Sequence, residues 1–206
     1  MTPPLLPTLG SSPVAAASWQ FAMDRLGCAI FNHSVRTYLH AGRAASRLNI
    51  LAGVDYSDEL LFCACLLHDL GTAADFDGPQ RFEVEGADAA AALLGTLDVP
   101  GRGIDEVWQA IALHTSPGIA ERLGTLPRLV RLGVLADFSQ PEPAAQDRDT
   151  QHLHELFPRS QIELALADAV VAQALRNPAK APPSSWPGGL LRAHLERPDE
   201  LGNSAF

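Results

Sequence analysis

Residues 60–71 read LLFCACLLHDLG and decide the fold, because apolar side chains cover every side of this stretch. A helix that is hydrophobic all round is buried in a protein core. We therefore predict a central buried helix that begins after Ser57 and ends at Gly71. His68 and Asp69 close the apolar run, and burying a carboxylate beside an imidazole is costly unless another group compensates the charge.

Further helices are predicted on both sides of this stretch from helix-spaced apolar residues and from cap signals. The clearest start is a Ser-x-x-Glu capping box formed by Ser160 and Glu163. Few residues follow the alternating Val/Ile/Thr pattern of strands, so the predicted fold class is all-α, an irregular helical bundle. The expected helices span residues 13–27, 32–50, 83–94, 104–115 and 127–138, with a last one from residue 160 onward.

The chain of 206 residues is expected to form one main domain. We predict a flexible N-terminus over residues 1–12, a catalytic domain over residues 13–176 and a Pro/Gly-rich C-terminal extension over residues 177–206. Residues 140–149 are rich in Pro, Asp and Gln, which is typical of a surface loop. The extension would either pack on the domain or stay mobile, and its Trp186 could form a subunit contact in a homo-oligomer.

The composition narrows the set of expected partners. A formal net charge of −9, without any Lys/Arg-rich run, would repel phosphate backbones and anionic membrane surfaces, so neither nucleic acid nor a membrane is expected. No apolar run reaches the ~20 residues of a bilayer-crossing helix. Three cysteines without a paired framework are typical of a reducing compartment. We expect a cytoplasmic protein that acts on a small molecule.

The pair His68-Asp69 suggests a metal site. A divalent cation would take nitrogen from the imidazole and oxygen from the carboxylate, and adjacent helical residues point about 100° apart, which suits neighbouring coordination positions. A helix-terminal histidine followed by a solvated aspartate would need no metal, and this reading stays open from the pair alone. His33 on an earlier helix and Asp137 at the end of an apolar helix strengthen the metal interpretation.

The order His33, His68-Asp69, Asp137 on successive helices resembles the H…HD…D signature of the HD superfamily of metal-dependent phosphohydrolases. The local text is most similar to the cyanamide hydratase-like branch of that superfamily. The resembling stretches lie within roughly residues 20–175. They are NHSVRT at residues 32–37, CLLHDLGT at 65–72, RFEVEGA at 81–87 and AIALHTS at 110–116.

The resemblance implies an irregular helical bundle of the HD-domain type and one divalent metal ion, Zn²⁺ or Fe²⁺, with Mn²⁺ as a third choice. Its ligands would be His33, His68, Asp69 and Asp137. His114 and Asp69 would take part in catalysis, His114 as a substrate-binding or proton-transfer residue. An ion with an open coordination position lowers the pKa of a bound water to about 7, which supplies a nucleophile at neutral pH. No organic cofactor is expected.

Two departures from the superfamily bear on the reaction. A phosphate substrate would favour nearby cations, and residues 69–80 contain none. Only His114 stands between the His-Asp pair and Asp137, which favours one metal over two and argues against an O₂-activating di-iron enzyme. We therefore expect a metal-dependent hydratase, a lyase that converts a nitrile or cyanamide to an amide or urea. The alternatives are hydrolysis of a nucleotide or other phosphate ester, and a non-catalytic metal-binding sensor or scaffold.

Four residues are candidates for the substrate pocket. Arg36 could share a helix face with His33, although a solvated arginine is as good an interpretation. Glu83 could orient a ligand histidine or merely complement a helix dipole. Phe82 and Trp108 could wall the pocket, although aromatic residues at helical spacing are more often core. The remaining histidines that fall in polar or C-terminal segments are expected to be solvated: His152, His154 and His194.

Overall fold

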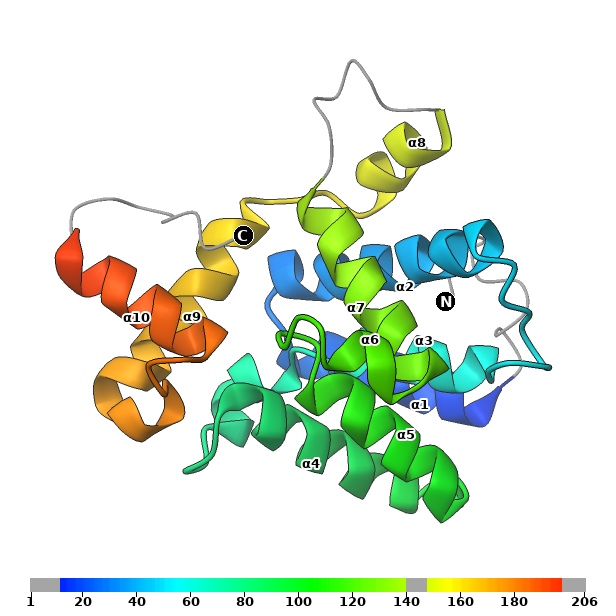
Figure 1. Ribbon diagram of the computed structural model, residues 1–206, viewed down its shortest axis with the longest axis horizontal. Helices are drawn as coiled ribbons and strands as arrows, with labels where there is room; N and C mark the ends of the chain where they lie inside the picture. Colours follow the sequence, from blue (N-terminus) through cyan, green and yellow to red (C-terminus); the bar gives the residue numbers. More distant parts are fainter. Residues whose placement is uncertain (1–11, 140–147, 198–206) are drawn as a thin grey trace.

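The structure, a computed structural model, describes residues 12–139 and 148–197, with only the backbone described for 148–150. It confirms the all-α class: the described residues contain helices and one isolated bridge, between Ala52 and Tyr56, and no strand. Figure 1 shows the helices arranged as an irregular bundle. In chain order they are α1 (Pro13–Arg25), α2 (Cys28–Arg47), α3 (Asp58–Leu67), the 3₁₀ turns η1 (Leu70–Thr72) and η2 (Ala74–Phe76), α4 (Phe82–Gly95), α5 (Gly101–Ala112), α6 (Ala120–Leu123), α7 (Thr125–Phe138), α8 (Arg148–Leu156), α9 (Ile162–Arg176), η4 (Pro178–Lys180) and α10 (Trp186–Glu196).

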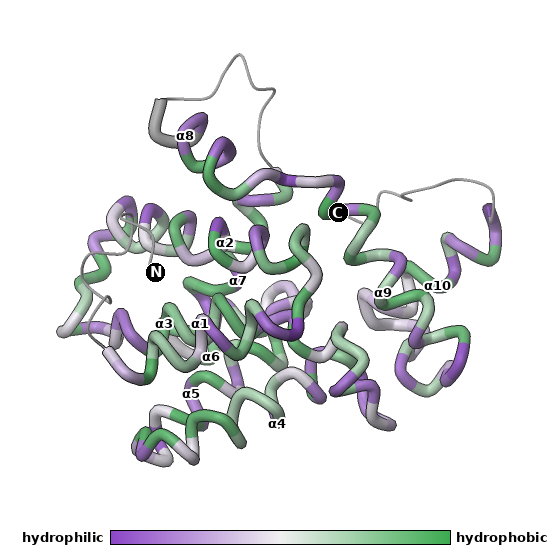
Figure 2. The backbone as a smooth tube through the Cα atoms, turned by 180° about the vertical axis from the view of Figure 1, so that it is seen from behind, coloured by the Kyte–Doolittle hydropathy of each residue, from purple (hydrophilic) through white to green (hydrophobic). Residues whose placement is uncertain are grey.

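Helix α3 is the centre of the bundle, as its sequence predicts. Residues 61–67 are all buried, and the helix is surrounded by α1, α2, α5 and α7. Cys63 and Cys65 are both fully buried in this core as free thiols. Figure 2 shows hydrophobic and hydrophilic stretches alternating along the helices, as amphipathic helices around a common core require.

Helices α2 and α7 cross at close range beside the site. A Cβ atom on Gly133 of α7 would lie 2.4 Å from the carbonyl oxygen of Thr37 and 3.2 Å from the backbone nitrogen of Ala41, both in α2. Only glycine allows the two backbones to come this near. His33 and Arg36 lie one turn or less from Thr37 on α2, and Asp137 lies one turn after Gly133 on α7.

Several helix ends differ from the sequence-based prediction by two to four residues, and those of α2 and α3 bear on the site. Helix α2 begins at Cys28 rather than at residue 32, so His33 lies more than a turn inside the helix. Helix α3 ends at Leu67, and the chain tightens into the 3₁₀ turn η1 instead of continuing to Gly71. The cause is a close approach: a Cβ atom on Gly71 would lie 1.8 Å from the carbonyl oxygen of Phe82, the first residue of α4.

The predicted capping box before α9 is wrong. Ser160 and Gln161 both adopt the left-handed conformation, with φ of 50° and 57°, and the N-cap is Gln161, which makes no side-chain cap. Glu163 instead forms an ion pair with Arg159. Arg159 also donates to the carbonyl oxygen of Asp137 at 2.6 Å. The turn before α9 therefore hydrogen-bonds to the end of α7 instead of capping α9.

The described part of the C-terminal extension packs on the domain. Lys180 is almost completely buried, and its Nζ donates to Asp77 Oδ1 at 2.6 Å and to the carbonyl oxygen of Gly78 at 2.9 Å. Gln173 Nε2 donates to the carbonyl oxygen of Gly71 at 2.8 Å. These bonds tie α9 and the segment after it to the turn that follows α3. Figure 1 shows α9 and α10 side by side at one side of the bundle.

Several predicted features fall partly or wholly outside the described residues. Residues 1–11 of the predicted N-terminal segment lie outside them, whereas Ser12, the last residue of that segment, caps α1. Residues 140–147 of the predicted loop also lie outside, and its last residues belong to α8, a helix the sequence did not indicate. Among the described helices, none combines the length and apolarity that crossing a bilayer demands.

Replacing Gly133 tests the α2–α7 crossing. Gly133→Ala places a methyl group against the Thr37 carbonyl, and overpacking of this kind should lower the free energy of unfolding by about 1–3 kcal/mol. Gly42→Ala is the matched control, because Gly42 also lies in a helix and a Cβ atom added there would meet nothing within 4 Å. The control should gain up to about 1 kcal/mol from helix propensity. Urea denaturation measures both, and equal stabilities of the two variants would contradict the close crossing.

Candidate metal centre

A group of buried side chains that could hold a metal ion lies where α2 meets the end of α3, and His33, His68 and Asp69 form it. All three are fully buried. His68 Nε2 lies 3.2 Å from His33 Nε2 and 3.2 Å from Asp69 Oδ2, and His33 Nε2 lies 3.8 Å from the same oxygen. His114, in the turn after α5, approaches the other oxygen, with its Nε2 3.6 Å from Asp69 Oδ1.

Hydrogen bonds to backbone carbonyls fix the orientation of two of these histidines. His68 Nδ1 lies 2.7 Å from the carbonyl oxygen of Cys65, and His114 Nδ1 lies 2.7 Å from that of Ile111. A carbonyl oxygen only accepts, so Nδ1 carries the proton of each neutral ring and donates it. The Nε2 lone pair then faces Asp69 and is available to a cation.

The Asp69 carboxylate has the properties of a metal ligand: it is ionised, and its oxygens are not used by ordinary hydrogen bonds within the described residues. Both of its oxygens are buried, and among the described residues neither accepts a hydrogen bond of ordinary geometry; the nearest ring nitrogens are His68 Nε2 at 3.2 Å and His114 Nε2 at 3.6 Å. Burial alone would raise the pKa of this carboxyl group, but the imidazoles of His68, His114 and His33 outweigh burial and hold the pKa well below its usual range. A buried, ionised and under-bonded carboxylate that faces imidazole nitrogens fits a divalent cation of the zinc and iron type.

Burial also acts on the histidines. It lowers the pKa of His33, and it lowers the pKa of His114 to about 4, so both rings are neutral at pH 7 and can offer a lone pair. Burial alone would also lower the pKa of His68, but the neighbouring Asp69 carboxylate outweighs it and raises that pKa. The opposite shifts of neighbouring rings show that the Asp69 carboxylate acts most strongly on His68.

Asp137 does not lie with this group, although the sequence predicted it as a ligand. It stands behind His33, whose Nδ1 is 2.7 Å from its Oδ2. Arg36 donates two hydrogen bonds to the same carboxylate, from Nε to Oδ1 at 2.7 Å and from Nη2 to Oδ2 at 2.8 Å. Burial alone would raise the Asp137 pKa, but hydrogen bonds from His33, His40 and Arg36 hold it well below its usual range. In this arrangement the carboxylate orients His33 so that its Nε2 faces Asp69.

None of the four predicted pocket residues lines the cavity at this site. Arg36 is fully buried behind His33, where it binds Asp137 and the carbonyl oxygens of residues 157 and 158. Phe82 lies behind His114, with ring centroids 5.7 Å apart. Glu83 is fully buried and accepts from Thr115 Oγ1 at 2.6 Å. Trp108 lies on the outer side of α5, where its Nε1 donates to Asp88 at 2.8 Å.

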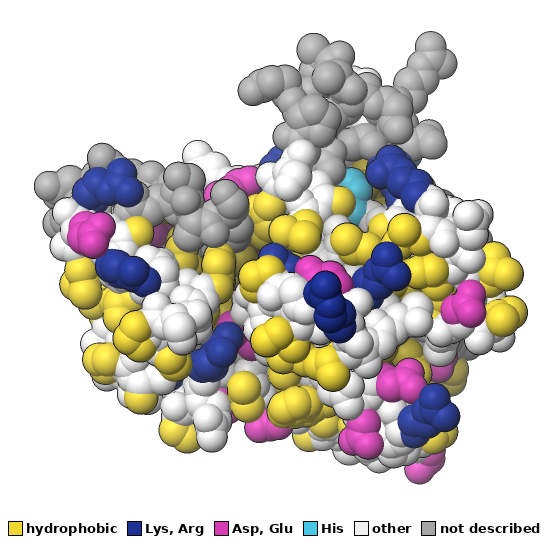
Figure 3. Space-filling view, in the orientation of Figure 1, with side chains coloured by type: hydrophobic (Ala, Val, Ile, Leu, Met, Phe, Trp, Pro, Cys, Tyr) yellow, Lys and Arg dark blue, Asp and Glu magenta, His cyan; other side chains and the backbone are white. Residues whose placement is uncertain are grey.

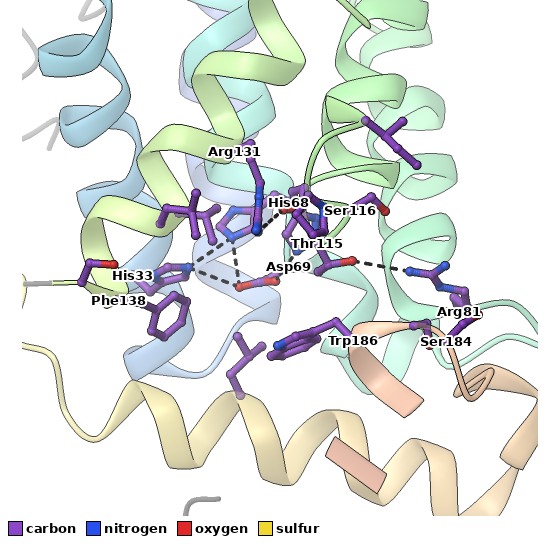
Figure 4. A pocket seen from close by; sticks show the side chains of 18 residues that line it. His33, His68, Asp69, Arg81, Thr115, Ser116, Arg131, Phe138, Ser184 and Trp186 are labelled. Atoms are coloured by element: carbon purple, nitrogen blue, oxygen red, sulfur yellow. Dashed lines mark hydrogen bonds and ion pairs between the residues drawn. The ribbon is translucent and has the colours of Figure 1, made fainter. Parts of the chain in front are cut away.

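A cavity opens directly on the group formed by His33, His68 and Asp69. Its volume of about 700 Å³ is within the usual range of small-molecule sites. Figure 4 shows Asp69 between Arg131 on one side and Trp186 on the other, with Arg81 and Ser184 at the end away from His33 and Phe138. His114 also lines this cavity. Its other lining residues are Thr115, Ser116, Pro117, Ile119, Val134, Leu135, Ser139, Leu166 and Ser185.

The sequence-based prediction missed both arginines of this cavity. Arg81 comes directly after the cation-free segment 69–80, and its Nη2 donates to Glu83 Oε1 at 2.5 Å. Arg131 Nη1 donates to the carbonyl oxygen of His114 at 2.9 Å, and its Nε lies 3.7 Å from Glu121. Arg131 faces the cavity from within an apolar helical stretch, and no motif marks it. Arg81 stands in the RFEVEGA stretch, which was the one signal that could have found it.

The other histidines differ in environment. His152 is exposed, as predicted. His154 is not fully solvated: burial lowers its pKa, and its Nε2 is buried without a hydrogen bond. His194 is half-buried on α10. On the face drawn in Figure 3, the basic and acidic groups of the described residues are scattered among hydrophobic side chains and do not gather into one basic surface.

The buried histidine–aspartate group of this helical bundle could hold a divalent metal ion. Residues 30–172, well over half of the chain, match the family model of the HD domain. The chain therefore belongs to the HD domain family. A comparison with curated proteins finds no match.

Removing one histidine of the group should abolish the stabilisation of the protein by metal. With free metal at about a hundredfold above Kd, binding should raise the free energy of unfolding by about 2.7 kcal/mol. We expect His68→Ala to lose this increase, because a nitrogen ligand is gone, while the control His152→Ala keeps it. Thermal melts with and without Zn²⁺, together with the metal content by elemental analysis, measure both. Equal responses of the two variants would contradict the site.

The Arg36–Asp137 pair should be essential for stability. Arg36→Leu leaves the buried Asp137 carboxylate without its bidentate partner, a change that costs about 3–5 kcal/mol. The control is Arg102→Leu, because the Arg102 side chain is 91% exposed and pairs with Glu106 on the surface of α5. Its effect should lie within the error of a denaturation measurement. A similar small loss for both variants would contradict the role assigned to Arg36.

Proposed function

We propose that this HD-domain protein is a metal-dependent hydrolase that cleaves a phosphate ester. Membership in the HD domain family indicates the metal-dependent hydrolase superfamily. The observation that carries the finer proposal is the cavity, which is lined by the under-bonded Asp69 carboxylate and by two arginines, Arg81 and Arg131. Guanidinium groups bind phosphoryl oxygens with two parallel hydrogen bonds.

His33, His68 and Asp69 would hold one divalent ion, Zn²⁺ or Fe²⁺ with Mn²⁺ as an alternative, and Asp137 would act through His33 rather than as a fourth ligand. A bound divalent ion supplies Lewis-acid polarisation of a phosphoryl oxygen and lowers the pKa of water. The three residues leave coordination positions for substrate and water, as catalytic sites require.

The residues of this chain would divide the remaining work. His114 Nε2 and Asp69 Oδ1, 3.6 Å apart, flank the space in front of the group, and neutral His114 can accept the proton of the attacking water. Arg131 would bind phosphoryl oxygens beside His114, since the two are joined by a hydrogen bond to the His114 carbonyl. Arg81 and Ser184 would bind the more distant part of the substrate.

Both arginines are paired with glutamates, Arg81 with the buried Glu83 and Arg131 with Glu121. Their charges are therefore already balanced in the free protein, and the pocket does not carry a large positive excess. The pairing holds each guanidinium in place, so its unused N–H groups would orient the substrate more than they attract it. We infer that the selectivity for an anion comes from hydrogen-bond geometry together with the bound metal.

Hydration of cyanamide or a nitrile is the competing function, and the resemblance of the local sequence motifs favours it. A cavity of about 700 Å³ is far larger than a molecule of a few heavy atoms needs. We therefore rank hydrolysis of a phosphate ester first. A non-catalytic scaffold is the third candidate, and it would show neither activity.

A substrate panel tests the proposal. The protein loaded in turn with Zn²⁺, Fe²⁺ and Mn²⁺ should release orthophosphate from phosphate monoesters and should not convert cyanamide to urea. His114→Asn should lower kcat about 10²–10⁴-fold, because it removes the proton-transfer residue. The metal content should stay unchanged, because His33, His68 and Asp69 remain in place. His152→Asn is the matched control and should keep full activity. Urea formation without phosphate release would overturn the proposal.

A further inference from the structure

One wall of the cavity comes from outside the residues that match the HD domain. The match ends at residue 172, whereas Ser184, Ser185 and Trp186 line the cavity. Figure 4 shows Trp186 on the side of Asp69 opposite to Arg131. A segment of this chain beyond its matched domain therefore lines the cavity.

Trp186 is held in place from several directions. It is the first residue of α10, and Ser185 caps that helix by accepting from the backbone nitrogen of Gly188 at 3.1 Å. The rings of Trp186 and Phe82 have centroids 6.0 Å apart. Upstream of it, Lys180 fixes the segment to the turn after α3 through Asp77. A large aromatic side chain fixed in this way is pre-organised, so that binding to it costs little conformational entropy.

Trp186 and Arg131 face the cavity from opposite sides of Asp69 (Figure 4). Trp186 supplies a large aromatic surface and Arg131 a guanidinium group, whereas the residues next to each are of mixed polarity, with Ser185 before Trp186 and Val134 one turn after Arg131 on α7. A substrate with its reacting group at Asp69 would therefore place a polar part against Arg131 and an apolar part against Trp186. The flat face of an indole prefers a planar ring, stacked or edge to face.

We propose that Trp186 is a specificity-determining residue that contacts a planar ring of the substrate. The inference rests on the proposed function and narrows its substrate class to phosphate esters with an aromatic ring close to the phosphate. Phe82 acts as a positioning residue, because it lies between Trp186 and His114, with its ring centroid 6.0 Å and 5.7 Å from theirs. The ring contact and the proton-transfer residue are thereby linked through one core side chain.

Two phosphonates that are not hydrolysed, one with a phenyl and one with a methyl group, separate the contribution of the ring to binding from that of the phosphoryl group. Calorimetry with the metal-loaded protein should show phenylphosphonate binding about tenfold more tightly than methylphosphonate, the size expected of one aromatic contact. Trp186→Leu should reduce this ratio to about twofold and leave the Kd of methylphosphonate unchanged, while Trp186→Phe should keep most of it. Trp108→Phe is the control, because Trp108 binds Asp88 away from the cavity, and it should keep the full ratio.

Each outcome decides the inference. A wild-type ratio near one, which needs no variant, or an unchanged ratio in Trp186→Leu would overturn it, and the proposed function would stand if phosphate esters are still cleaved. If neither phosphonate binds and no phosphate ester is cleaved, the proposed function fails and the inference falls with it. Circular dichroism and metal content of each variant show that a lost ratio is not caused by lost folding.

Discussion

The structure depends on one electrostatic constraint: the ionised carboxylate of Asp69 is buried just after the end of α3, the most apolar of the described helices. Among the described residues neither oxygen has an ordinary hydrogen-bond partner, and imidazoles from two other segments lie around the charge. His33 comes from α2 and His114 from the turn after α5. The bundle can be described as the arrangement of helices that brings these rings to the end of α3.

The second carboxylate of the site supports the first. Asp137 binds His33 on the side away from Asp69, and Arg36 fixes it with a bidentate ion pair. This chain of contacts requires α2 and α7 to approach closely, and Gly133 permits that approach one turn before Asp137. Backbone packing and site electrostatics are therefore parts of one design, since the glycine sets the distance across which the ion pair forms.

The sequence predicts the fold class and the His68-Asp69 pair, because both depend on residues that are close together in the sequence. Apolar periodicity gives most of the helices, and the His68-Asp69 pair follows directly from the apolar run that precedes it. The capping box at Ser160 and Glu163 failed because Arg159 competes for Glu163 and also binds α7. The placement of Asp137 and of the cavity residues depends on which faces of separate helices meet. Arg131 and Trp186 lie on elements far apart in sequence, so no local spacing could reveal their shared cavity.

The anchoring of the C-terminal segment has a consequence for how such a protein can diversify. The residues that hold the charge at the end of α3 and those that form the wall with Trp186 belong to different stretches of chain, joined by Lys180, Asp77 and Gln173. Substitutions in the C-terminal wall can therefore alter the shape of the cavity without changing the buried histidine–aspartate group. Related chains with the same reactive group could differ in substrate preference through this segment alone.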